Sequence, residues 1–367
     1  MLITGTDFDD GTVNYSTCHF VERERYEQDK NIQIRNGSIL ITKDGTLGKV
    51  AYVQGLSMPA TLNAGVFNVE IRNTSIVDER YLFQYLKAPF LMDYVDKKAT
   101  GGTIKHLNQN ILVDFPVVMP KKTEQVSIGN FFQRIDTLIT LHQRKYEKLV
   151  NIKKSMLDKM FPQNGVSVPE IRFKGFTDPW EQRKLGELSR SFEYGLNAAA
   201  KEYDGQNKYL RITDIDDTSR QFVSADITSP DANLAEADNY RLSDGDVLFA
   251  RTGASVGKTY LYKKSDGLVY FAGFLIRAKI KESVSAGFIF QNTLTRSYER
   301  YIAITSQRSG QPGVNAQEYA EYQLMLPELF EQEKIAKLLE ALDTLITLHQ
   351  REHIKPILEV KRVKRNE

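Results

Sequence analysis

A stretch of nine residues occurs twice in the chain, and it limits how every other part of the sequence can be interpreted. Residues 136–144, with the sequence DTLITLHQR, recur unchanged as residues 343–351, an offset of 343 − 136 = 207 positions. Identity over such a length is not expected by chance, so the chain is an internal duplication. The duplication predicts a pseudo-two-fold protein that presents two similar surfaces to a partner with two similar sites.

The duplication continues outside this string, but the two halves have diverged unequally. Pro120 and the pair 124–125 recur at the same offset as Pro327 and 331–332. Looser matches join 36–40 to 244–248, 45–49 to 253–258, and 3–4 to 212–213. Nearly identical helical segments beside divergent domains suggest a fixed scaffold that carries two readers of different specificity.

Two long helices are expected from the spacing of apolar residues. From Lys122 to Met160 the apolar positions alternate at steps of three and four, which is the seam of a coiled coil, and Pro327 opens a second such pattern. The expected seam residues are Ile128, Phe131, Ile135, Leu138, His142, Leu149, Ile335, Leu338, Leu342, Leu345 and His349.

The two seam histidines, His142 and His349, are expected to help set the helix register. Further ligands at the fixed spacing that a metal site needs are not evident around them. Beyond His349 the second copy diverges from the first, and Pro356 is expected to break or kink the second helix.

The rest of the chain predicts two mixed domains, so we expect an α+β protein. Strands are expected at 38–42, 49–53 and 116–120, and the helical spacing of 79–92 predicts a helix that stops near Pro89. The most apolar run, 271–276, predicts a buried strand and is far shorter than the roughly 18–20 residues of a membrane span. The expected domains are a mixed domain at 1–120, a helical spacer at 121–165, a second mixed domain at 166–326, and a helix with a basic tail at 327–367.

The amino-acid composition excludes few functional classes, but it does favour one cellular compartment. The net charge of +2 does not by itself predict a nucleic-acid binder, although clustered basic residues would permit one. The single Cys18 allows no internal disulfide, and the N-terminus does not resemble a signal peptide, so we expect a cytoplasmic protein. Paired carboxylates, nucleophile triads, metal clusters and methyltransferase, helicase or nuclease signatures do not stand out. We therefore expect no catalysis and no cofactor.

A glycine-rich turn at residues 251–259 resembles a phosphate-binding loop but has the wrong spacing. Three residues separate Gly253 from Gly257, whereas that loop needs four. A tight turn that displays Lys258 is favoured over nucleotide hydrolysis, with a plain surface hairpin as the alternative. Because Gly-Lys recurs at 48–49, we favour a contact with a phosphate or a base.

Two further glycine-rich loops, at 101–108 and 309–315, occupy matching places in the two halves. Such loops can offer backbone N–H groups and side-chain amides to DNA, or they can be folded for their own turn geometry. The candidate DNA contacts are Lys43, Thr46, Lys49, Lys105, Asn108, Arg211, Arg251, Thr252, Ser255, Lys258, Gln311 and Asn315.

These segments together resemble a known family. Residues 168–188 resemble the opening of a target-recognition domain in the specificity subunit of type I restriction–modification enzymes. Residues 242–248, with the turn that carries Gly257 and Lys258, resemble the family's central strand and turn. The starts of the two long helices, at 124–125 and 136–139 and their repeats, resemble its conserved helices.

The resemblance implies a non-catalytic reader of double-stranded DNA. Each target-recognition domain would read one half of a bipartite, asymmetric target. The two helical regions would pack as an antiparallel coiled coil that fixes the spacing between the half-sites. They would also bind two adenine-N6 methyltransferase subunits and, with the translocase–nuclease subunits, form the restriction complex.

The chain also departs from the family pattern. The family's first domain begins with its own version of residues 169–208, whereas Ile3 here already corresponds to Ile212. We therefore expect an N-terminally truncated or rearranged variant. The alternative is a decayed subunit that acts only as a coiled-coil assembly partner of the methyltransferase.

Overall fold

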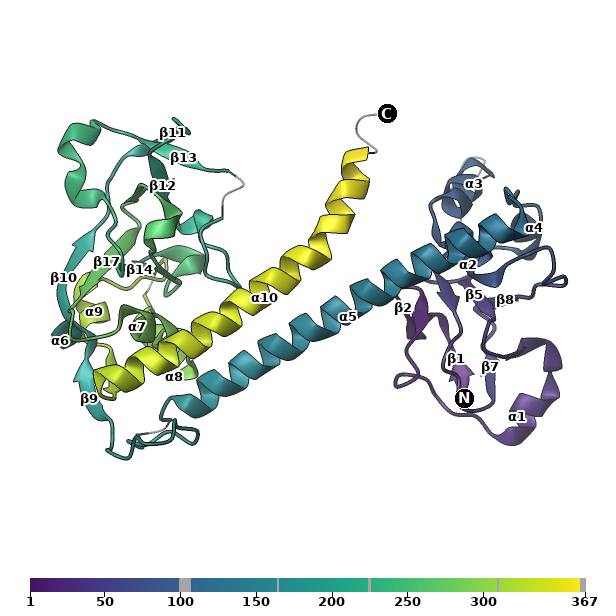
Figure 1. The fold of residues 1–367 in the computed structure, drawn as a ribbon, viewed down its shortest axis with the longest axis horizontal. Coiled ribbons are helices and arrows are strands. Elements are labelled where there is room, and N and C mark those ends of the chain that lie inside the picture. The colour runs from purple at the N-terminus through teal and green to yellow at the C-terminus, as the bar shows by residue number, and fades with distance from the viewer. Residues whose placement is uncertain (99–106, 164, 224–225, 309, 364–367) are drawn as a thin grey trace. The chain divides into compact units, whose positions relative to one another are not determined.

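The computed structural model describes residues 1–98, 107–163, 165–223, 226–308 and 310–363, and divides into two compact units, Met1–Leu141 and His142–Glu367. Each unit combines short strands and helices with part of a long helix (Figure 1). Helix α5 (Lys122–Met160) begins in the first unit and ends in the second, which also contains α10 (Leu329–Val363). The expected α+β class and the expected bounds of the first long helix are confirmed.

The first unit is built on two small sheets, with strand orders β6-β5-β8 and β1-β7-β4, and a hairpin of β2 and β3. Its strands are β1 (Leu2–Ile3), β2 (Phe8–Asp9), β3 (Thr12–Val13), β4 (Gln33–Ile34), β5 (Ile39–Thr42), β6 (Val50–Tyr52), β7 (Ala60–Leu62) and β8 (Val66–Val69). Its helices before α5 are α1 (Arg23–Gln28), α2 (Glu79–Lys87), α3 (Phe90–Lys98) and α4 (Gln109–Val113). β5 is buried along its whole length, because α2 covers one face of its sheet and β1, β4 and β7 lie under the other.

The second unit has a larger antiparallel sheet, in the order β10-β17-β14-β15, and three two-stranded sheets that pair β9 with β18, β11 with β13 and β12 with β16. Its strands are β9 (Glu181–Lys184), β10 (Ser189–Tyr194), β11 (Ala199–Glu202), β12 (Lys208–Leu210), β13 (Thr228–Asp231), β14 (Val247–Ala250), β15 (Thr259–Leu261), β16 (Val269–Phe271), β17 (Leu275–Ile280) and β18 (Gln323–Leu326). Its short helices are α6 (Leu185–Leu188), α7 (Ala286–Asn292), α8 (Arg296–Thr305) and α9 (Ala316–Ala320).

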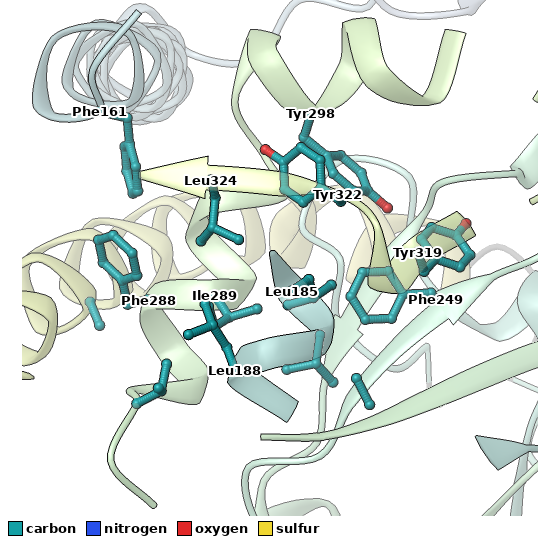
Figure 2. Close-up of a cluster of buried hydrophobic side chains, with 14 of the residues drawn as sticks. Phe161, Leu185, Leu188, Phe249, Phe288, Ile289, Tyr298, Tyr319, Tyr322 and Leu324 are labelled. Carbon is teal, nitrogen blue, oxygen red and sulfur yellow. The ribbon is translucent and has the colours of Figure 1, made fainter. Parts of the chain in front are cut away.

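An aromatic core holds the end of α5 in the second unit (Figure 2). The ring centroids of Phe161, just past α5, and Phe288 of α7 lie 5.2 Å apart, and those of Tyr298 and Tyr322 also lie 5.2 Å apart, edge to face. All four side chains are buried. Because each buried aromatic ring removes a large apolar area from water, this cluster fixes the helix end to the domain.

A glutamine near the start of each long helix joins that helix to its own domain in the same way. Gln125 accepts a hydrogen bond from the N–H of Asp78 (2.9 Å), and Gln332 accepts one from the N–H of Ser285 (2.9 Å). Asp78 and Ser285 are the N-cap residues of α2 and α7. Both glutamines are buried, and each also donates to the carbonyl five residues before it.

Further along each long helix, a second hydrogen bond again joins the helix to its own domain. Gln84 of α2 donates to Asp136 of α5 (2.6 Å), and Gln291 of α7 donates to Asp343 of α10 (3.0 Å). The residues of both joints differ by the same 207 positions as the nine-residue string. The duplication therefore includes the attachment of each domain to its helix, which the loose similarity of the domain sequences does not reveal.

Within the second unit, the end of α5 and the start of α10 run antiparallel (Figure 1). The Nδ1 atoms of His142 and His349 lie 3.3 Å apart, and Lys153 of α5 forms an ion pair with Asp343 of α10 (2.5 Å). His142 and His349 hold the same place in the two copies of the repeat. A local two-fold axis of the helix pair therefore passes between these side chains, which lie in the seam as predicted.

The face of α10 that is buried differs from the face predicted from the spacing of its apolar residues. Leu338 and Leu345 are 36% and 43% exposed, whereas the neighbouring Leu339 and Ile346 are 0% and 9% exposed. Ile335 and His349 are buried as predicted, and Leu342 is half-buried. The face differs because the first turns of α10 pack against α7 and the core of its own domain as well as against α5.

On α5, the predicted seam residues Phe131 and Leu138 are exposed, and Ile128, Ile135 and Leu149 are half-buried. In the described part of the chain, two predicted seam residues on each helix are therefore exposed rather than buried. Their role as contacts with a partner stays a prediction.

Two local predictions are wrong. Residues 116–120 form no strand in the described part of the chain, because the prolines at both ends lack the N–H that a ladder needs. The predicted stop of the helix near Pro89 is confirmed, since α2 ends at Lys87 and a separate helix, α3, begins at Phe90. The apolar run 271–276 is not one strand, because β16 ends at Phe271 and β17 begins at Leu275.

Pro356 does not end the second helix. α10 continues to Val363, and Figure 1 shows that its axis turns near the C-terminal end. A proline removes one backbone N–H and displaces a carbonyl, which bends a long helix without ending it when the hydrogen bonds on either side persist. The expected break is therefore wrong, and the bend agrees with the expected kink.

The match of Ile3 with Ile212 is wrong by two positions. Thr4 and Arg211 each cap a single 3-10 turn, and the backbone N–H of each donates to the carboxylate of Asp7 (2.8 Å) or Asp214 (2.9 Å). These pairs keep the offset of 207. The two domains are thus aligned by the hydrogen-bond geometry of the turn, where the similarity of apolar residues is misleading.

Candidate nucleic-acid interface

Two predicted loops of the second unit lie side by side. The N–H of Gly253 donates to the carbonyl of Pro312 (3.0 Å), and the N–H of Val314 donates to the carbonyl of Arg251 (2.9 Å). Gly253 has φ +72°, a backbone conformation that favours glycine. The predicted contacts Arg251, Thr252, Ser255 and Gln311 are therefore gathered on one surface around this pair of loops.

The turn after β14 is held from beneath by a buried tyrosine. The hydroxyl of Tyr319 donates to the carbonyl of Ala250 (2.7 Å) and accepts from the N–H of Gly257 (3.2 Å). Burial raises the pKa of Tyr319 well above the ordinary tyrosine range. The turn is thus a rigid platform rather than a loose loop.

Lys258 does not point outward from this turn. Its side chain is 8% exposed, and its ammonium donates to the carbonyl of Ile215 (3.1 Å) and pairs with Asp217 (2.5 Å). The ammonium in turn holds the pKa of Asp217 below its usual range. The prediction that the turn displays a lysine is wrong here, because the loop that carries Ile215 and Asp217 covers the side chain.

Arg211 and Asn315 have structural partners. Arg211 makes a bidentate ion pair with Asp214 (2.9 and 2.7 Å) and keeps about a third of its side chain exposed. Asn315 is exposed, but its side-chain oxygen caps α9 by accepting from the N–H of Glu318 (2.9 Å). Both can still meet a ligand, although part of each hydrogen-bonding capacity is already used.

A concave surface next to these loops combines arginine and aromatic side chains. A cavity of about 580 Å³ is lined by Tyr194, Arg211, Arg251 and Phe274, among others. The guanidinium of Arg251 lies 5.1 Å from the centroid of the Tyr194 ring. Cation–π stacking of this kind orients an arginine without consuming its donors.

In the first unit, the corresponding turn displays its lysine. Thr46 and Lys49 are exposed, and Lys43 is half-buried with its ammonium 5.0 Å from the centroid of the Phe67 ring. Asn108 is exposed and caps α4 by accepting from the N–H of Ile111 (3.0 Å). Lys105, with the rest of residues 99–106, and Ser309 of the matching loop lie outside the described residues.

The nine-residue repeat places identical apolar side chains on the surface of both long helices. Leu138 and its repeat Leu345 are exposed, and so are Leu141 and its repeat Leu348. Leucines that are exposed at the same positions of both repeats are candidates for a partner-binding surface, and this role stays a prediction. Leu141 and Leu348 were not among the predicted contacts, although their identity in both copies could have indicated them.

The described ranges contain no group of three or more histidine, cysteine or acidic side chains that could hold a metal ion. Nor is any helix in these ranges long and apolar enough to cross a membrane.

Comparison with known proteins identifies related chains. The family model described as the type I restriction modification DNA specificity domain matches residues 3–151 and 177–358. The MjaVIII specificity subunit of Methanocaldococcus jannaschii is 24% identical over 88% of this chain and 76% of its own length. The EcoKI specificity subunit of Escherichia coli is 20% identical over 93% of this chain and 75% of its own length.

A solved structure shares the fold. The S subunit of a type I restriction–modification system from M. genitalium superposes with a TM-score of 0.60 at 13% identity, covering 99% of this chain and 86% of that one. The fold of two domains with long helices is therefore shared with a specificity subunit.

Proposed function

Because the chain belongs to the family of type I restriction modification DNA specificity domains, we propose that it reads a bipartite target on double-stranded DNA and performs no catalysis itself. Each unit would read one half-site, and α5 with α10 would set the distance between the half-sites. The observation that carries this proposal is the repeated attachment of two divergent domains to one helical scaffold, through Gln125 and Gln332.

The same scaffold would bind the catalytic partners. Leu138 and Leu141 on α5 and their repeats on α10 give two equal apolar surfaces, which suits two copies of one methyltransferase subunit. Restriction subunits would join this complex. The repeated nine residues would then be alike because they bind the same protein twice, whereas the domains differ because they read different bases.

DNA selection by the co-purified complex tests this function. The chain, co-expressed with the methyltransferase subunit, would be mixed with a random-sequence DNA pool, and bound DNA would be recovered by gel shift. We expect enrichment of a two-part motif. A subunit that serves only in assembly would still co-purify with the methyltransferase but would enrich no sequence.

The two equivalent turn lysines are expected to behave differently. Lys49→Met should weaken DNA binding on all sequences and lower the slope of log K against log salt by about 0.9, as expected for one lost phosphate contact. Lys258→Met should leave that slope unchanged, because its ammonium is already paired inside the protein. Titrations at several salt concentrations measure both, and a lower slope for Lys258→Met alone would contradict this assignment.

The leucine surfaces are expected to bind one methyltransferase subunit each. Leu345→Glu should leave a complex with one methyltransferase, and Leu138→Glu with Leu345→Glu should leave none, because a charge in an apolar contact is costly. The mass of the purified complex measures this. Thr137→Glu with Thr344→Glu is the matched control, since both threonines are exposed and hold the same position in the two copies of the repeat. Unchanged stoichiometry in the leucine variants would refute the surface.

A further inference from the structure

An exposed phenylalanine projects from the second unit beside the candidate DNA surface. Phe274 is 58% exposed, although it lies between the buried strands β16 and β17. Singly exposed apolar side chains are ordinary on protein surfaces, so what distinguishes Phe274 is its position beside an arginine and a second exposed aromatic ring.

The turn that carries Phe274 is fixed in place. The carbonyl of Phe274 accepts from the N–H of Arg251 (3.0 Å), and the N–H of Gly273 donates to the carbonyl of Leu196 (2.8 Å). The next residue, Leu275, donates to the carbonyl of Ala272 (2.9 Å). A ring on a turn this well bonded loses little conformational entropy when it contacts a ligand.

The surroundings of the ring suit a nucleic acid. Phe274 lines the same cavity as Arg251 and Tyr194, and Tyr194 is also exposed. Arg251 is half-buried, and its guanidinium lies 5.1 Å from the centroid of the Tyr194 ring. An apolar ring next to a guanidinium combines a surface for base stacking with a phosphate or base contact.

We propose that Phe274 inserts between two base pairs of the half-site read by the second unit, partly unstacking them, while Arg251 contacts the DNA beside that step. This inference rests on the proposed function and adds the means by which the second domain deforms its target. Apolar wedges of this kind open base steps and kink the duplex, so the ease of unstacking a step would contribute to specificity.

Base-analogue fluorescence tests the insertion. The complex of this chain with its methyltransferase would be bound to duplexes of its own motif, with 2-aminopurine or pyrrolocytosine at successive positions of the half-site. We expect fluorescence to rise at one step with the unaltered chain. Phe274→Ala should abolish that rise and weaken binding about tenfold, and Phe274→Trp should restore both.

Two comparisons make the result specific. Ile304→Ala, which removes a 65% exposed side chain from α8 of the same unit, should change neither signal. Phe274→Ala with unchanged fluorescence, or no fluorescent step in the unaltered complex, would overturn the insertion. Failure of the unaltered complex to prefer its motif at all would instead refute the proposed function, before any variant is made.

Discussion

Seven residues inserted after Thr140 in α5 are expected to widen the spacer of the methylated DNA motif by about three base pairs. The insertion lies between Asp136, which is bonded to the first domain, and His142, which meets α10. Seven helical residues add about 10.5 Å, and one base pair rises about 3.4 Å. Because seven residues make close to two turns, the faces on either side of the insertion keep their directions.

Sequencing of methylated adenines in cells that express the lengthened chain with its methyltransferase measures the spacer. The half-sites themselves should not change, because neither domain is altered. The matched control is the same insertion after Gly175, an open position with φ +100° in the segment that follows α5, where the spacer should stay as it was. An unchanged spacer in the α5 variant would show that α5 does not set the distance between readers.

Replacement of Arg277 by methionine is expected to destabilise the second unit by about 3–5 kcal/mol. This guanidinium is almost fully buried in β17, donates to the carbonyls of Asn239 and Arg241 (2.7 Å each), and pairs with Glu193 and Asp246. Burial already raises the pKa of Asp246. Loss of the arginine would leave a buried carboxyl and two carbonyls without their partner.

Urea unfolding of the second unit measures the loss. Arg190→Gln is the control, because Arg190 pairs with Glu282 (2.6 Å) in the same domain but both side chains are mostly exposed. That variant should lose less than about 1 kcal/mol. Equal losses for the two arginines would mean that the buried network around Arg277 contributes no more than a surface ion pair.

The features of the long helices could be predicted from the sequence. Apolar spacing over Lys122 to Met160 gave the bounds of α5, because a long amphipathic pattern outweighs local preferences. The two histidines that were expected to lie in the seam do so, and their Nδ1 atoms lie 3.3 Å apart. These features depend on periodicity and identity, which a single sequence contains.

Features that depend on a distant partner could not be predicted. Lys258 is buried because residues about 40 positions earlier cover it, so its Gly-Lys motif does not distinguish it from the exposed Lys49. The buried face of α10 is set by α7, which moves burial from Leu338 to Leu339. Phe274 lies in an apolar run whose only sign of a turn is the preceding glycine. Its exposed side chain could therefore not be predicted from the sequence.

Mapping of methylated adenines in cells that contain this chain and its methyltransferase tests the central claim most directly. Two domains of different sequence on one repeated scaffold predict a bipartite motif, with two unlike halves separated by a spacer of fixed length. A single uninterrupted motif, or methylation at no defined sequence in a complex that assembles, would contradict the account of two working readers.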